Sequence, residues 1–174
     1  MEKNIVKKNF IKKTRSIQLG YFLGFIITLC FMGFTFFLQS QGLIPCPLCL
    51  LQRIMMILLS LVFFIGMFSP FKKTGNIILG LIGLLITFAG MLLAGRQAWL
   101  QYIPPLNQGG CGVSLTYLLS ILPITDVAKM IWQGGTECSE LGWVFLGLSL
   151  AEWSLIIFGF FFLFVILQIK RSLK

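Results

Sequence analysis

The fold is decided by the stretch at residues 77–95, which reads IILGLIGLLITFAGMLLAG and contains no charged side chain. About 20 apolar residues are the length that an α-helix needs to cross the hydrocarbon core of a bilayer. Similar stretches lie at about residues 17–38, 48–68 and 150–169. The sequence therefore predicts an all-α integral membrane protein, a four-helix transmembrane bundle that forms a single domain over residues 1–174.

The composition of the whole chain agrees with this prediction. Of its 174 residues, 57% are apolar and only 11% are charged, whereas about 25% of the residues in soluble domains are charged. A water-soluble chain of this length could not bury so many apolar side chains, because a small domain leaves much of its surface wet. The absence of histidine excludes Ser-His-Asp triads and histidine metal ligands.

Basic residues gather on one side of the predicted bundle, before the first span, between the second and third, and after the fourth. By the positive-inside rule this side is cytoplasmic, so both termini are expected there. Two outer loops are then expected at about residues 39–47 and 96–149. The basic residues that give the net charge of +9 flank the membrane spans. Binding to anionic lipid therefore explains this charge better than binding to nucleic acid. The outer side also holds the four tryptophans, which are typical interfacial anchors: Trp99, Trp132, Trp143 and Trp153.

The second outer loop contains two segments with helical apolar spacing, residues 115–122 and 125–132. Ser114 is a suitable N-cap for the first segment, and Pro123 separates the two. We expect short amphipathic helices that lie on the membrane surface. The alternative is a loop that packs on the outer end of the bundle.

Four of the five cysteines fall on the predicted outer side: Cys46, Cys49, Cys111 and Cys138. The outer side of a bacterial membrane is oxidising, so disulfides persist there. Four thiols allow three pairings, and the sequence alone does not choose among them. The fifth, Cys30, lies within the first span, where we expect a small buried apolar residue without a functional role.

The motif Cys46-Pro47-Leu48-Cys49 has three interpretations. A zinc site is disfavoured because Cys111 and Cys138 are far apart in the sequence and do not form a second ligand pair of matching spacing. We therefore expect no metal. A static structural disulfide is the second interpretation. The third is redox catalysis, which we favour because a C-x-x-C disulfide closes a tight loop that is suited to exchange.

The local geometry favours redox catalysis. Pro47 suits the first position of a helix, so Cys46 is expected to be the N-cap and Cys49 the third helical residue. The unpaired N–H groups and the helix dipole would then stabilise a thiolate at Cys49. Arg53 follows one turn later on the same face, and a charge inside a membrane helix usually marks function. Its alternative roles are to extend toward the outer interface or to pair with an acid in a loop.

Disulfide formation releases two electrons and two protons, which need an acceptor. The sequence contains no haem-ligating histidine, flavin fingerprint or iron–sulfur spacing. We therefore expect a lipid-soluble acceptor, a quinone. Cys111 lies in the glycine-rich stretch Gly109-Gly110-Cys111-Gly112, where an exposed sulfur could exchange with a protein partner. The alternative is that Cys111 and Cys138 only staple the loop.

These motifs together resemble the bacterial disulfide bond formation protein B (DsbB) family over almost the whole chain, from the first span onward. The segments that carry the resemblance are Cys46-Pro47-Leu48-Cys49-Leu50-Leu51-Gln52-Arg53, Arg96-Gln97-Ala98-Trp99-Leu100-Gln101, Cys111-Gly112, Glu137-Cys138 and Trp143-Val144-Phe145-Leu146-Gly147-Leu148-Ser149 with Trp153.

The resemblance implies a protein-disulfide:quinone oxidoreductase of the bacterial inner membrane, which reoxidises a periplasmic thioredoxin-fold protein of the DsbA type. It implies redox-active disulfides Cys46–Cys49 and Cys111–Cys138. Cys111 would exchange with the partner, and Cys138 would then bond transiently to Cys46. Cys49 would contact ubiquinone or menaquinone as a thiolate, and Arg53 would stabilise it.

Some family members have a quinone-associated histidine near the end of the third span. This chain has Arg96 and Gln97 in that neighbourhood, which makes them candidate quinone-binding residues.

Two other function classes remain open at this point. One is a vitamin K epoxide reductase-like protein, which also combines four helices with a C-x-x-C motif. In that family the loop cysteines precede the quinone-proximal motif, which is the reverse of the order found here. The other is a membrane scaffold whose cysteines form inert disulfides.

Overall fold

The computed structural model describes residues 2–42, 46–68, 73–103, 123, 125–126, 129, 132 and 144–173. Its long helices are α1 (Glu2–Ser40), α2 (Pro47–Phe68), α3 (Lys73–Tyr102) and α7 (Leu150–Leu173). Two short strands, β1 (Val144–Phe145) and β2 (Leu148–Ser149), precede α7. Each of the four predicted apolar stretches lies within one of the long helices.

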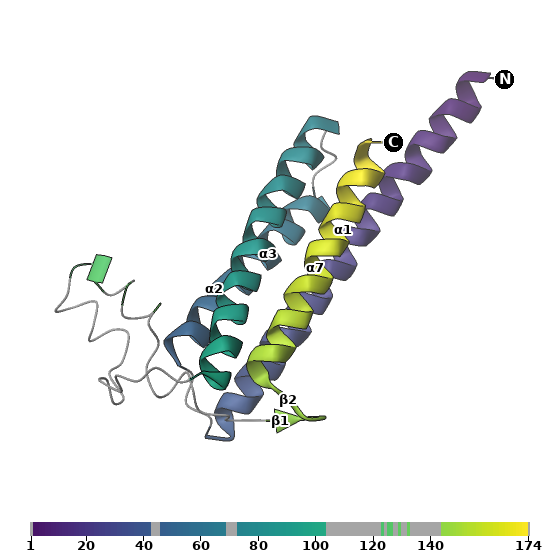
Figure 1. The fold of residues 1–174 in the computed structure, drawn as a ribbon. Coiled ribbons are helices and arrows are strands. Elements are labelled where there is room, and N and C mark those ends of the chain that lie inside the picture. The colour runs from purple at the N-terminus through teal and green to yellow at the C-terminus, as the bar shows by residue number, and fades with distance from the viewer. Residues whose placement is uncertain are drawn as a thin grey trace.

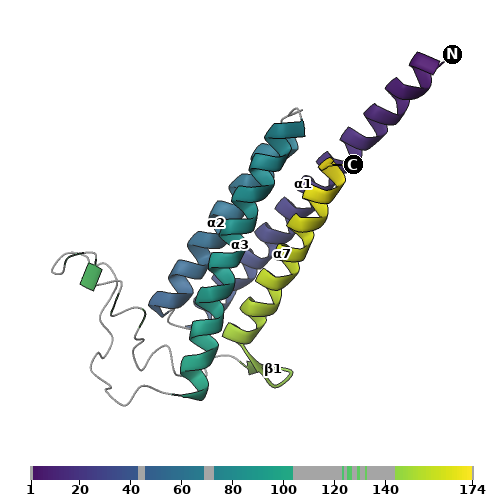
Figure 2. The same cartoon turned by 45° about the horizontal axis from the view of Figure 1, so that its top comes forward.

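The long helices run up and down side by side (Figure 1). Helix α2 packs between α1 and α3, and α3 packs against α7, whereas α7 makes much less contact with α1. Both chain ends lie at one end of the bundle, and the β1–β2 hairpin lies at the other, as two views of the molecule show (Figures 1 and 2). The bundle is therefore closed along three of its seams and looser along the α7–α1 seam.

Four segments of these helices are long and apolar enough to cross a membrane: Ile17–Ser40, Pro47–Phe68, Thr74–Tyr102 and Leu150–Leu173. Large apolar side chains point outward along them, with Leu85 69% and Leu163 63% exposed. Such a surface would be unfavourable in water but is well solvated by lipid tails. The chain is therefore a multi-pass membrane protein, and the predicted fold class is confirmed.

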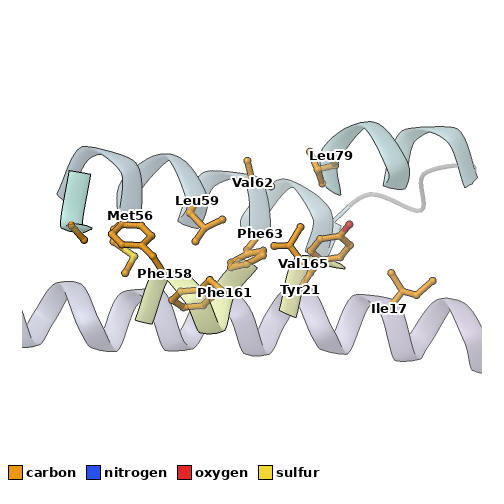
Figure 3. Packing of buried hydrophobic residues seen from close by; sticks show 11 residues of the cluster. Ile17, Tyr21, Met56, Leu59, Val62, Phe63, Leu79, Phe158, Phe161 and Val165 are labelled. Atoms are coloured by element: carbon orange, nitrogen blue, oxygen red, sulfur yellow. The ribbon is translucent and has the colours of Figure 1, made fainter. Parts of the chain in front are cut away.

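Aliphatic and aromatic side chains together fill the interior between the helices (Figure 3). Phe63 of α2 and Phe158 and Phe161 of α7 are almost completely buried. Phe158 packs on α3 at Gly90, where an added Cβ would lie 2.3 Å from the phenyl ring. The lack of a side chain at Gly90 is what lets this ring approach the α3 backbone.

Several predicted limits differ from the structure. Helix α1 begins at Glu2 and α3 at Lys73, ahead of the expected residues 17 and 77, and α3 and α7 end later than expected. Helix α3 continues through Arg96 to Tyr102, so residues 96–102 of the expected loop are helical. The extra turns bury Gln97 and Leu100 against α2. Hydropathy alone does not reveal this packing between helices. Helix α7 extends past residue 169 to Leu173, because Lys170 and Arg171 in its last turn suit the negative end of the helix dipole.

The amphipathic helix predicted at residues 115–122 lies outside the described residues. In the segment at residues 125–132, four positions are described and all are helical: Thr125, Asp126, Lys129 and Trp132. This agrees with a helix there, and its amphipathic placement on the membrane stays a prediction.

The β1–β2 hairpin was not predicted. Its strands pair Val144 with Ser149 and Phe145 with Leu148, and the two residues between them have positive φ, 55° at Leu146 and 80° at Gly147. This is the backbone of a type I′ turn, for which asparagine and glycine are the usual residues. A leucine in the first turn position therefore conceals the hairpin from sequence analysis.

A reciprocal cap joins the hairpin to α7. The Ser149 N–H donates to the Glu152 carboxylate at 2.7 Å, and the Glu152 N–H donates to Ser149 Oγ at 3.3 Å. Tyr102 at the end of α3 donates its hydroxyl to the same carboxylate at 2.7 Å. The Tyr102 hydrogen bond to this capping box links the end of α3 to the start of α7.

Candidate functional site

The two sulfurs of the C-x-x-C motif meet at the first turn of α2. The helix begins at Pro47, and the Leu50 N–H donates to the Cys46 carbonyl at 3.1 Å as its first backbone bond. The Cys49 N–H donates to Cys46 Sγ at 3.3 Å, so the Cys46 side chain caps the helix. The two Sγ atoms lie 2.9 Å apart. The prediction of Cys46 as N-cap and Cys49 as third helical residue is confirmed.

The sulfur pair is shielded by the neighbouring helix. Cys46 is only 4% exposed and packs with Leu48 and with Leu100 of α3, while Cys49 is partly buried at the edge of this cluster. The positive end of the α2 dipole therefore acts on Cys49 in surroundings that contain little water, where electrostatic effects are strong.

Two side-chain amides extend from Cys49 into the bundle. Gln97 of α3 donates from Nε2 to Cys49 Sγ at 3.1 Å. Gln52 of α2 donates from Nε2 to Gln97 Oε1 at 2.7 Å. Of the two residues predicted near a quinone in this neighbourhood, the structure thus brings Gln97 to the sulfur.

Arg53 reaches from α2 to the last turns of α1. Its guanidinium donates to the Gln39 side-chain oxygen and, at 3.2 Å, to the Thr35 carbonyl, and it lies 5.3 Å from the centroid of the Phe36 ring. The guanidinium therefore extends toward the last turns of α1, and whether it reaches the outer membrane interface stays a prediction. In the described part of the chain its hydrogen-bond partners are neutral, so no acid cancels its charge there.

A cavity of about 60 Å³ connects these groups, and Cys49, Gln52, Arg53 and Gln97 all contribute to its wall. Beside it lies an apolar groove of about 350 Å³ between α1 and α7, rimmed by Phe145 of the hairpin. The same side chains border both spaces: Phe31, Thr35, Leu150, Ser154 and Ile157. The groove follows the α7–α1 seam, where the helices make the least contact.

The other predicted site residues lie elsewhere. Arg96 donates from Nε to the Trp132 carbonyl at 3.0 Å, and its guanidinium lies 5.7 Å from the centroid of that indole. It does not contribute to the wall of the cavity, and its binding role stays a prediction. Cys111 and Cys138 lie outside the described residues. Cys30 is exposed on α1, so the expectation that it is buried is wrong.

Within the described residues, no three cysteine, aspartate or glutamate side chains cluster as metal ligands would. Because Cys111 and Cys138 are not among these residues, the absence of a metal stays a prediction.

Gln39 and Gln52 were not predicted as site residues. Gln52 carried a usable signal, because an amide within an apolar span, next to an arginine, usually marks a functional position. Gln39 lies at the end of its span, where polar residues are ordinary. Its contact with Arg53 depends on how α1 and α2 pack.

This arrangement provides two sulfurs in contact, an N–H donor directed at each of them, and a cation in the wall of the adjoining cavity. Donors and positive charge favour a thiolate over a thiol. A thiolate next to a second sulfur is the arrangement required for thiol–disulfide exchange.

The comparisons with known proteins agree with this chemistry. A family model described as "Disulfide bond formation protein DsbB" matches residues 17–168. Proteins named "Disulfide bond formation protein B" are similar to this chain. One from Hahella chejuensis is 40% identical over 87% of this chain and 93% of its own length. Another, from Aromatoleum aromaticum, is 36% identical over 95% and 98%.

No solved structure matches the chain. The extent of these sequence matches, the four membrane helices and the paired sulfurs of α2 lead to one assignment: the chain belongs to the DsbB family of membrane oxidoreductases that act in disulfide bond formation.

Proposed function

We propose that the protein is a thiol oxidase that takes electrons from a reduced periplasmic dithiol protein of the DsbA type and delivers them to a membrane quinone. We place it in the bacterial inner membrane with both termini in the cytoplasm. The outer end of the bundle, which carries the Cys46–Cys49 pair, would then face the periplasm, where disulfides are formed.

The observation that carries the proposal is the position of Cys49 in a small cavity that adjoins the apolar groove between α1 and α7. Cys49 lines the small cavity, and this cavity shares bordering residues with the apolar groove between α1 and α7. A water-soluble acceptor would have no reason to approach through an apolar seam. A lipid-soluble acceptor could enter from the membrane, because apolar ligands favour apolar clefts that contain few polar groups.

The residues present fit a quinone. The groove wall would hold its apolar chain, while the Gln97 amide and the Arg53 guanidinium provide donors for carbonyl oxygens near the sulfur. When bound, a quinone supplies an acceptor for two electrons and two protons.

The chain itself carries out the sulfur chemistry. A partner thiolate attacks the Cys111–Cys138 disulfide, and the second partner thiol resolves the mixed disulfide, so the partner is oxidised and this pair is reduced. The reduced pair then opens the Cys46–Cys49 disulfide by the same exchange. Reclosure of Cys46–Cys49 releases the two electrons and two protons. The net reaction converts partner dithiol plus quinone into partner disulfide plus quinol.

The test is a reconstituted assay with the purified protein in lipid, a reduced thioredoxin-fold partner and ubiquinone or menaquinone. Cys49→Ser is expected to abolish quinone reduction, because only one sulfur remains in the pair. Cys30→Ser is the matched control, since Cys30 is an exposed thiol of α1 that does not line the cavity, and it should leave the rate unchanged. Quinone reduction at the parental rate in Cys49→Ser would disprove the proposal.

A further inference from the structure

The two amides beside Cys49 are buried and point in the same direction. Gln52 is 6% and Gln97 4% exposed. The N–H of Gln52 is bound to the oxygen of Gln97, at 2.7 Å, and the N–H of Gln97 is bound to the sulfur of Cys49, at 3.1 Å. A buried amide is costly unless it is hydrogen bonded, so breaking either of these two hydrogen bonds would be unfavourable.

The orientation of the Gln97 amide matters because one end of a primary amide donates hydrogen bonds and the other accepts them. Rotation of the Gln97 amide by half a turn would replace its N–H with its carbonyl oxygen, which is an acceptor only. An oxygen directed at Cys49 Sγ would repel a thiolate, whereas the N–H stabilises it. In the orientation found here, the Gln52 N–H is satisfied by the Gln97 oxygen, and a rotated amide would present a second N–H to it instead.

We propose that Gln52 is a positioning residue that holds the Gln97 amide with its N–H toward Cys49, and so favours the thiolate form of that sulfur. The inference rests on the proposed function for the role of Cys49 in electron transfer. Cys46 Sγ also faces Cys49, and the Arg53 guanidinium lies in the wall of the same cavity. The amides therefore add hydrogen bonding to the positive charge that Arg53 already provides. Unlike a second cation, they add no buried charge to the membrane interior.

The test measures the reactivity of Cys49 without quinone or partner. In a chain with Cys30, Cys46, Cys111 and Cys138 replaced by serine, Cys49 is the sole thiol and is alkylated with iodoacetamide at neutral pH. One hydrogen bond to a charged group changes the thiolate population about tenfold. A more basic thiolate is a better nucleophile, which offsets about half of this effect on a logarithmic scale. Gln52→Met and Gln97→Met are therefore each expected to slow alkylation about threefold.

A double variant separates positioning from independent effects. If Gln52 acts through Gln97, the variant with both methionines should react no more slowly than Gln97→Met alone. The matched control is Gln101→Met, one turn along α3, where the amide oxygen accepts from Ser149 Oγ instead. This control should alkylate at the parental rate.

If Gln52 and Gln97 had only a structural role, their replacement would change the access of iodoacetamide to the Cys49 sulfur. This would give a different dependence of the alkylation rate on pH. At a pH high enough to ionise Cys49 in every variant, only the difference in nucleophilicity remains, so a positioning effect leaves the variants up to about threefold faster than the parent, whereas restricted access still slows the reaction. Multiplicative slowing in the double variant, or slowing that persists at high pH, would overturn the inference. Gln52→Leu provides a second apolar replacement if Gln52→Met does not fold. Since no quinone is present, a failure of the proposed function would leave these rates unaffected.

Discussion

Single residues of α2 define the candidate site because helical spacing gathers them around one cavity. Cys49, Gln52 and Arg53 are separated by three and four positions, and side chains at these separations lie on one face of a helix. All three line the small cavity. Sequence spacing thus places the cation near the sulfur, whereas the partners on α1 and α3 depend on packing between helices.

Arg53 is expected to act on quinone binding and not on the partner protein. Its guanidinium lies at the cavity and has neutral hydrogen-bond partners among the described residues, so its charge is available to a bound carbonyl oxygen. Arg53→Ala should raise the KM for quinone about tenfold, as expected for the loss of a charged hydrogen bond. Steady-state kinetics with each substrate varied in turn provide the measurement.

A charge-matched control for Arg53→Ala is Lys170→Ala, since Lys170 is exposed in the last turn of α7, at the opposite end of the bundle. It removes one positive charge and should leave both KM values unchanged. An equal rise in the KM for the partner and for quinone in Arg53→Ala would show that this placement is wrong.

Two polar residues show why the site could be predicted only in part. Gln52 was visible as an amide beside an arginine in an apolar span, yet its partner Gln97 lies 45 positions away on another helix. Gln39 looked like an ordinary residue at the end of a span. A sequence supplies the periodicity within one helix, but it does not supply the rotation of one helix against the next.

At the scale of helices, Gly90 sets how closely α3 and α7 approach each other. Gly90→Ala on α3 should destabilise the bundle by about 1–3 kcal/mol, as overpacking does. The added methyl group would meet the Phe158 ring of α7 at 2.3 Å, and that ring is 1% exposed and has little room to move. Thermal unfolding in detergent should show a lower Tm.

The matched control is Gly159→Ala on α7, where an added Cβ meets nothing within 4 Å. Alanine is a better helix former than glycine by about 1 kcal/mol, so this variant should unfold at the same or a higher temperature. If both variants lowered the Tm equally, the close α3–α7 contact would not be what Gly90 provides.

The elements also differ in how readily the sequence predicts them. Long apolar helices are imposed by lipid, because backbone groups in a bilayer must pair within the segment itself, and hydropathy alone located all four. The β1–β2 hairpin was missed because its turn places Leu146 at φ 55°, where asparagine or glycine is usual. The Ser149–Glu152 capping box had a recognisable spacing that the prediction did not use.

At the scale of the whole molecule, charge and topology make one joint prediction. The described chain ends lie together at one end of the bundle, and the hairpin lies at the other (Figure 1). The hairpin must therefore lie on the opposite side of the membrane from the two chain ends. The lysines and arginines are concentrated at the end with the termini, which the positive-inside rule assigns to the cytoplasm. The hairpin and the sulfur pair would then be periplasmic.

Single cysteines introduced into a chain that lacks the five native ones would test this orientation. Leu146→Cys, at a position that is 78% exposed in the hairpin turn, should react with a membrane-impermeant maleimide in spheroplasts with intact membranes. Lys170→Cys, exposed in the last turn of α7, should react only after the membrane is permeabilised. The reverse pattern would place Cys46 and Cys49 on the reducing side, where no periplasmic dithiol could reach them, and the proposed electron transfer would fail.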